Sequence, residues 1–154
     1  MLEGEPVEIL LVEDNPSDAE LALHALKKCK VANHILHLRD GAEALDFLFR
    51  RGEHSGRSAE NRPTLILLDL KLPKVNGLQV LQQSKNERST KAIPVILLTS
   101  SKEESDMAAG YQLGVNSYIQ KPVNFAEFQE VVQQLGMYWL LVNSKPPAAA
   151  FQST

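Results

Sequence analysis

The chain has 154 residues, a formal net charge of −3 and 44% hydrophobic residues, enough apolar mass for one ordinary globular domain with a core. This acidic balance argues against a nucleic-acid surface, which normally shows a basic patch or stripe. No apolar stretch approaches the ~20 residues that cross a bilayer, and the acidic start MLEGEPVEILLV is unlike a signal peptide. The single cysteine, Cys29, cannot form an internal disulfide. We therefore expect a cytoplasmic protein that binds neither nucleic acid nor a membrane.

Short apolar runs alternate with segments of helical periodicity along the whole chain. The runs predict five strands, at residues 7–12, 34–38, 65–70, 94–99 and 117–119. The segments between and after them predict helices at residues 18–28 and 42–50, then from about residue 78, around residues 107–113, and over residues 125–142. Five repeats of strand and helix predict an α/β fold, with a parallel sheet covered by helices on both faces.

The remaining segments predict loops and one tail. The longest loop, residues 50–63, is polar and contains glycine, so we expect it to be exposed and mobile. We assign residues 1–144 to one domain and residues 145–154 to a C-terminal tail.

The third apolar run, LILLDLKLP, carries a carboxylate that does not fit a buried strand. A run this apolar is typical of a strand buried on both faces, where a carboxylate without a partner is costly. Asp69 is therefore expected just past the buried part, at the carboxyl end of the strand, unless something compensates its charge. Ligands bind outside these ends in open parallel sheets, so the polar residues there are candidates for function.

Such polar residues follow or end four of the predicted strands: Glu13 and Asp14, Asp69, Thr99, and Lys121. Three carboxylates in one crevice repel, since two unit charges ~4 Å apart cost about 4 kcal/mol at an effective dielectric of 20. Lys121 offsets one charge, and a hard divalent cation offsets more. Carboxylate and carbonyl oxygens with room for water suit Mg²⁺. The pattern predicts a magnesium site.

A carboxylate beside such a metal can attack phosphorus and form an aspartyl phosphate. We interpret Asp69 as this nucleophile, with Thr99 and Lys121 donating to phosphoryl oxygens. Other uses of the fold are disfavoured, because the loop EDNPSDAE after the first strand is acidic and lacks the glycines of phosphate-binding and dinucleotide motifs.

With these residues in place, the chain resembles the receiver domains of two-component response regulators. The resemblance covers nearly all of residues 7–142 and rests on VEDN, LLDLKLP, LLTS and YIQKP in that order. It implies a flavodoxin-like fold with a five-stranded sheet, and phosphotransfer from a sensor histidine kinase to Asp69. It further implies Mg²⁺ held by Asp14, Asp69 and the backbone carbonyl of Lys71, with Glu13 acting through water. Thr99 and Tyr118 would be the switch residues, and the Lys121–Pro122 bond would be cis.

The long loop, the preceding ALDFLFRRG and the following LPKVNG resemble, more narrowly, the single-domain regulators of cyanobacterial phytochromes. The kinase would then be a phytochrome. Lys71 and Ser100 depart from the commonest receiver pattern, and our hypothesis is that they alter dephosphorylation and switching.

The last predicted helix is apolar nearly all round in its C-terminal half. One stripe can cover the sheet, whereas Met137, Leu140 and Leu141 fall outside it. Either the tail with Phe151 folds back over these side chains, or they form a partner surface, and we favour a homodimer through the last strand and helix.

Two functions from other classes remain. The first is a constitutive interaction module with an unphosphorylated acidic pocket. The second is an aspartate-nucleophile phosphatase, which needs a second acid where Lys71 stands. We expect a phosphoacceptor with only self-catalysed phosphotransfer and autodephosphorylation, not an enzyme that turns over a separate substrate.

Overall fold

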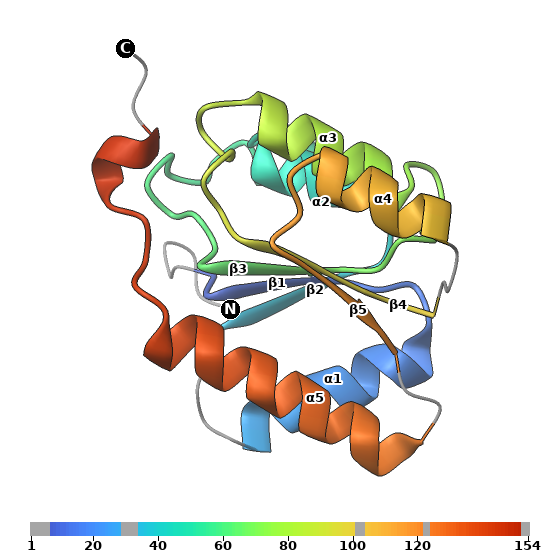
Figure 1. The fold of residues 1–154 in the computed structure, drawn as a ribbon. Coiled ribbons are helices and arrows are strands. Elements are labelled where there is room, and N and C mark those ends of the chain that lie inside the picture. Colours follow the sequence, from blue (N-terminus) through green and yellow to red (C-terminus); the bar gives the residue numbers. More distant parts are fainter. Residues whose placement is uncertain (1–6, 29–33, 101–103, 122–123, 152–154) are drawn as a thin grey trace.

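Five parallel strands form one sheet in the order β2-β1-β3-β4-β5 (Figure 1). The computed structural model describes residues 7–28, 34–100, 104–121 and 124–151. The strands are β1 (Ile9–Val12), β2 (Ile35–Leu38), β3 (Leu65–Leu68), β4 (Val95–Thr99) and β5 (Ser117–Gln120). This strand order is that of flavodoxin-like folds, so the predicted fold class is confirmed.

Helices cover both faces of the sheet. They are α1 (Pro16–Lys28), α2 (Gly41–Leu48), α3 (Gly77–Asn86), α4 (Glu104–Gln112) and α5 (Phe125–Met137). Helices α1 and α5 lie on one face, and α2, α3 and α4 lie on the other (Figure 1). Alternate residues of each central strand therefore enter two different cores: Leu67 packs with α1 and α5, whereas Leu68 packs on the opposite side. Burial on both faces explains why these strands are apolar without alternation.

The strand register brings the predicted site residues to one edge of the sheet. Val12 of β1 pairs with Leu68 of β3, and Thr99 of β4 pairs with Gln120 of β5. The residues that follow these strand ends are Glu13, Asp69 and Lys121, which places them at the same carboxyl edge.

Several element ends differ from the sequence-based expectations. Helix α1 begins at Pro16, because proline is well suited to the first turn of a helix, where its missing N–H is not needed. Helix α3 begins at Gly77 behind Asn76, whose side chain forms a capping box with Gln79. Helix α5 ends at Met137, and a π-helical turn, Tyr138–Val142, continues the chain in place of the predicted α-helix.

The long loop is exposed at most positions, as predicted, but it is also tied to the domain. It contains a short 3₁₀ helix, Gly52–His54, and its Arg57 guanidinium donates to the carbonyl oxygens of Phe47 and Asn61. The same guanidinium stacks on the Phe47 ring, 3.6 Å from its centroid. A charged side chain thus anchors a segment whose composition predicted only mobility.

The tail folds back onto another part of the domain and leaves Met137 exposed. Phe151, in the 3₁₀ helix Ala148–Phe151, packs on the core shared by α2 and α3, and Arg62 lies 4.1 Å from its ring centroid. Met137 and Tyr138 keep 48% and 49% of their surface exposed. The alternative in which the tail covers Met137, Leu140 and Leu141 is therefore wrong for Met137. Within the described ranges, no helix has the length and apolarity to span a bilayer.

Candidate functional site

The carboxyl edge of the sheet gathers one ammonium and three carboxylates. Lys121 Nζ contacts Glu13 Oε1, lies 2.9 Å from Asp18 Oδ2, and lies 3.4 Å from Asp69 Oδ2. The Lys121 side chain is only 8% exposed, and those of Glu13 and Asp69 are 4% and 9% exposed. Since surface ion pairs add little and buried ones respond strongly to the loss of a partner, this network is sensitive to any change of charge.

The position of Asp69 agrees with the expectation from the sequence. Strand β3 ends at Leu68, so Asp69 is the first residue beyond it, and its N–H donates to the carbonyl oxygen of Val12 at 3.0 Å. Asp69 is nevertheless buried, with 8% of its surface exposed. Lys121 therefore provides the compensation that a buried carboxylate requires.

One oxygen of Asp69 remains unsatisfied. Its Oδ1 is buried and has no hydrogen-bond partner within the described part of the chain. One carboxylate oxygen from each of Glu13, Asp14 and Asp69 lies within 4.8 Å of the others, and Asp14 is exposed. An orphaned buried oxygen beside two further carboxylates fits a hard cation that takes oxygen ligands and retains water.

The electrostatics of the cluster oppose full ionisation. The pKa of Glu13 is raised to about 8, and burial is the main cause. The hydrogen bond to Asp69 and the negative charge of Asp69 act in the same direction, whereas Lys121 acts in the opposite direction. Burial alone would lower the pKa of Lys121, but hydrogen bonds to Glu13 and Asp18 and the nearby negative charges raise it above its usual value. The ammonium therefore stays charged, and the carboxylates compete for it.

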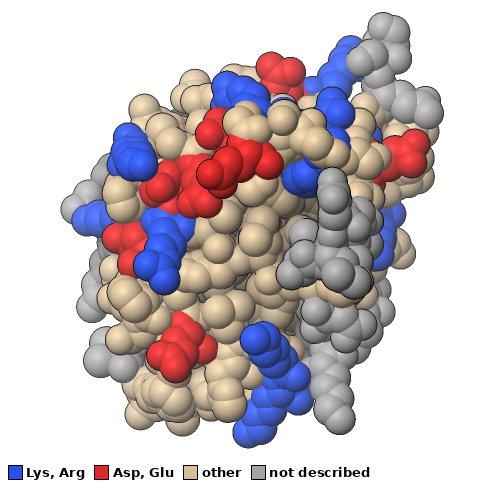
Figure 2. Space-filling model, turned by 180° about the vertical axis from the view of Figure 1, so that it is seen from behind, with Lys and Arg blue, Asp and Glu red and all other residues tan. Residues whose placement is uncertain are grey.

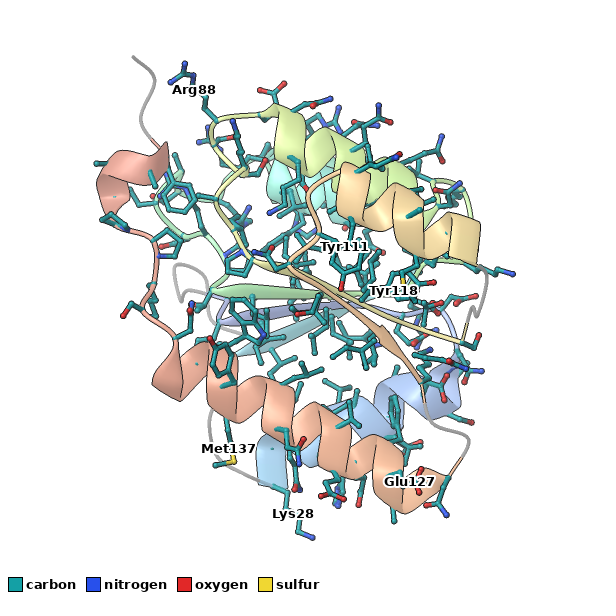
Figure 3. The ribbon with its side chains drawn as sticks, viewed as in Figure 1. Lys28, Arg88, Tyr111, Tyr118, Glu127 and Met137 are labelled. Carbon is teal, nitrogen blue, oxygen red and sulfur yellow. The ribbon has the colours of Figure 1, made fainter. Side chains whose placement is uncertain are left out.

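The two predicted switch residues occupy different places. Thr99 ends β4 at the same edge, is fully buried, and accepts a hydrogen bond from the Lys121 N–H through its carbonyl oxygen at 2.7 Å. Tyr118 is half-buried in β5 and packs on the side of the sheet that α4 covers, where Figure 3 labels it together with Tyr111 of α4. Tyr118 therefore lies beside Gly110 of α4, two residues before the end of β5.

Two further predictions concern the loops that follow β3 and β5. Lys71 is exposed two residues after Asp69, and the role of its carbonyl stays a prediction. Pro122, and with it the predicted cis bond, lies outside the described residues, as does Cys29. Ser100 is exposed directly after Thr99.

Sequence reasoning missed three residues that contact the site. Asp18 binds Lys121 from the first turn of α1, and its place in the acidic stretch EDNPSDAE could have indicated this. His37 Nε2 lies 2.8 Å from the Glu13 carbonyl oxygen and so holds the backbone of the acidic loop. Gly77 donates its N–H to the Leu70 carbonyl oxygen at 2.7 Å and touches the Asp69 backbone, a contact for which the sequence carries no signal.

A second acidic region lies past the end of β2, beside the candidate metal site. The face seen in Figure 2 carries a band of acidic side chains, and one hollow at the start of α2 is lined by Asp40, Glu43, Asp46 and Glu53. Among the described residues, only Glu13, Asp14 and Asp69 bring three potential metal ligands together. The hollow therefore does not compete with the candidate metal site.

The site and fold define a class of protein, and comparison with known proteins agrees. The family model described as the response regulator receiver domain matches residues 9–133. The chain belongs to this family.

Individual relatives are similar over nearly their full length. The probable methanogenesis regulatory protein FilR2 of Methanothrix harundinacea is 43% identical, over 97% of this chain and 94% of that protein. Response regulator Rcp1 of Synechocystis is 41% identical, over 93% and 95%. A crystal structure of the phosphorylated cyanobacterial phytochrome response regulator RcpA superposes with a TM-score of 0.86 at 38% identity, covering 93% of this chain and 100% of that one. The chain is thus a receiver-domain response regulator, homologous to phytochrome response regulators.

Proposed function

We propose that this chain accepts a phosphoryl group on Asp69 from a sensor histidine kinase and thereby switches a protein-binding surface. The observation that carries the proposal is the Asp69 carboxylate itself. One of its oxygens lies 3.4 Å from Lys121 Nζ, and the other is buried without a partner among the described residues. One oxygen thus contacts the lysine, and the other has no partner in the described part of the chain that a phosphoryl group or a metal ion would have to displace.

The reaction requires charge neutralisation more than acid–base chemistry. An Asp69 oxygen attacks the phosphorus of a phosphohistidine, the new P–O bond forms, and the P–N bond to the histidine breaks. Lys121 is placed beside Asp69 to donate to an oxygen of the transferred group. Thr99, the last residue of the neighbouring strand, would supply a hydroxyl to the same group.

Mg²⁺ would be held by Asp14, Asp69 and the Lys71 carbonyl, with Glu13 acting through water. When bound, it neutralises the carboxylates and the developing charge on the phosphoryl oxygens. The acidic cluster supports this assignment, and so does a solved structure of Rcp1 in its Mn²⁺-bound form, which is 40% identical to this chain.

The test is the intact mass of the protein after incubation with acetyl phosphate, with and without Mg²⁺. We expect the parent to gain one phosphoryl group only with Mg²⁺, and Asp69→Asn to gain none. Gain of a phosphoryl group by both proteins would mean that Asp69 is not the nucleophile. Gain by neither would favour the alternative of a constitutive interaction module, in which the receiver fold binds partners without phosphorylation.

A groove next to the site is suited to the kinase. It has a volume of about 490 Å³ between α1 and the start of α5, and Ser17, Glu20, Leu21, His24 and Phe125 line it. Phe125 is 57% exposed there, an apolar anchor of the kind that interfaces use. Because the relatives include phytochrome response regulators, we propose a phytochrome as the kinase. Phe125→Ser should slow transfer from the kinase and leave phosphorylation by acetyl phosphate unchanged.

The switched surface would be the face formed by α4, β5 and the end of α5, through which we also propose a homodimer. Tyr111 on α4 is 53% exposed, and at the end of α5 Met137 and the following residue Tyr138 are 48% and 49% exposed. Met137 lies on the side of α5 near Lys28 of α1 (Figure 3). Light scattering at high micromolar concentration tests this. A dimer mass that Met137→Lys reduces is expected, and a monomer mass for the parent would end the idea.

A further inference from the structure

A small cavity lined by three arginines lies away from the phosphorylation site. It has a volume of about 90 Å³ and lies between the end of α2, the long loop and the turn before β4. Arg50, Arg57 and Arg62 line it together with the polar residues Ser58, Ser89 and Thr90, and no Asp or Glu is among its lining residues. The strands β3 and β4 begin beside this cavity and end at Leu68, directly before Asp69, and at Thr99, so the cavity lies at the opposite edge of the sheet.

The positive charge in this cavity lacks a carboxylate partner. Arg57 bonds two carbonyl oxygens and an aromatic face, and the Nε of Arg62 donates to the Ser89 carbonyl oxygen at 3.2 Å. Within the described ranges, neither side chain forms an ion pair with an acidic residue. Burial lowers the pKa of Arg57, and the charge of Arg50 adds to this effect. The three side chains thus concentrate positive charge where the protein does not neutralise it.

The cap at the end of α2 involves the side chain of Arg57 and the backbone of Arg50. The carbonyl groups at the end of α2 attract cations, and Arg57 satisfies one of them by bonding Phe47 O. Arg50 follows the cap residue Phe49 in a left-handed conformation, φ 55°, and the N–H groups of Arg50 and Arg51 donate to the carbonyl oxygens of Phe47 and Asp46 at 3.3 and 2.8 Å. This is a Schellman cap, in which the Arg50 side chain takes no part. Glycine would serve the cap as well, so the cap does not require the Arg50 side chain that lines the cavity.

We propose that this cavity binds a phosphate group, either free inorganic phosphate or the phosphate of a monoester. Guanidinium groups present paired N–H donors that match phosphate oxygens, and two or three of them converge on sites of this kind. The hydroxyl groups of Ser58 and Ser89 supply further donors at the rim. Phe151 of the tail stacks on Arg62 and fixes one of these guanidinium groups. The site is separate from Asp69 and does not depend on phosphotransfer.

The test is a titration of the full chain with sodium phosphate in EDTA, at constant ionic strength set with chloride, followed by calorimetry or by arginine side-chain NMR signals. Arg50→Gly is the informative variant, because glycine tolerates the local conformation and the fold is retained. Arg51→Gln is the matched control. It removes the same charge from the next residue, whose side chain pairs with Asp46 and does not line the cavity.

We expect Arg50→Gly to weaken phosphate binding by about ten-fold, the effect of losing one charge-assisted donor, and Arg51→Gln to leave it nearly unchanged. Phosphorylation of Asp69 by acetyl phosphate should not change in Arg50→Gly. Binding of phenyl phosphate more tightly than of inorganic phosphate would identify a monoester as the ligand, and the reverse would identify free phosphate. The proposal is overturned if phosphate binds no better than chloride, or if both variants lose affinity equally.

Discussion

Gly77 offers a sharp test of how the fold positions Asp69. A β-carbon at this residue would lie 2.2 Å from the Asp69 carbonyl oxygen and 2.7 Å from the Leu70 α-carbon. An ordinary contact is 3.4 Å or more. In Gly77→Ala the new methyl group must therefore displace the backbone of Asp69, or the start of α3, by about 1 Å, and overpacking of this kind costs about 1–3 kcal/mol.

The same displacement should slow the chemistry. Misplacement of a reacting group by about 1 Å can cost roughly 100-fold in rate, because the attacking oxygen leaves its aligned position. We therefore expect Gly77→Ala to unfold at lower urea concentration and to accept phosphoryl groups from acetyl phosphate about 100-fold more slowly. Urea denaturation and the time course of intact mass measure the two effects.

Gly56→Ala is the matched control. Nothing lies within 4 Å of a β-carbon built at Gly56, so this variant should stay within about 0.5 kcal/mol of the parent. A Gly77→Ala protein with the stability and phosphorylation rate of the parent would refute the positioning argument. Lower stability with an unchanged rate would show that α3 yields to the methyl group and Asp69 does not.

Three further substitutions test the charge network around Lys121, the half-buried Lys85 and the N-terminal cap of α3. Lys121→Met should lower the free energy of unfolding, measured by urea titration, by about 3 kcal/mol, because it leaves buried carboxylates without a counter-ion. The control is Lys74→Met, which should cost under about 0.5 kcal/mol because the Lys74 side chain is 71% exposed. Burial lowers the pKa of Lys85 to about 8 from 10.5, so the folded protein binds fewer protons between these values. The free energy of unfolding of the parent should therefore rise relative to Lys85→Met between pH 8 and 10.5, and urea titrations that show no such rise would contradict the shift. Asn76→Ala removes the capping box of α3 and should cost about 1 kcal/mol by thermal unfolding, while an unchanged melting temperature would mean that the cap adds no stability.

The sheet and its carboxyl edge were predictable because they follow from strong local patterns. Apolar runs such as LILLDL can only be buried on both faces, and parallel pairing then brings Asp69 next to the residue after β1. The π-helical turn after Met137 was not predictable, because its apolar residues are equally compatible with a continued α-helix.

Contacts between segments that are distant in the sequence were also not predictable. The spacing of Phe47, Arg57 and Asn61 in the sequence does not indicate that one guanidinium would join them, since the path of a loop is set by tertiary packing. The contact between Gly77 and the Asp69 backbone is likewise invisible in sequence, because a glycine before a helix also suits an ordinary turn.

Lys121 is a single counter-ion shared among three acids. When a further negative group enters the cluster, the hydrogen bonds of the ammonium must be redistributed among more acceptors. A group added to Asp69 competes with Glu13 and Asp18 for the same ammonium. Asp18 is the partner that water can most easily replace, since its side chain is 32% exposed while that of Glu13 is 4% exposed. Loss of that bond would release the first turn of α1 from the residue that follows β5. Added charge at Asp69 would thereby change the contacts of α1, which lies on the face of the sheet opposite α4.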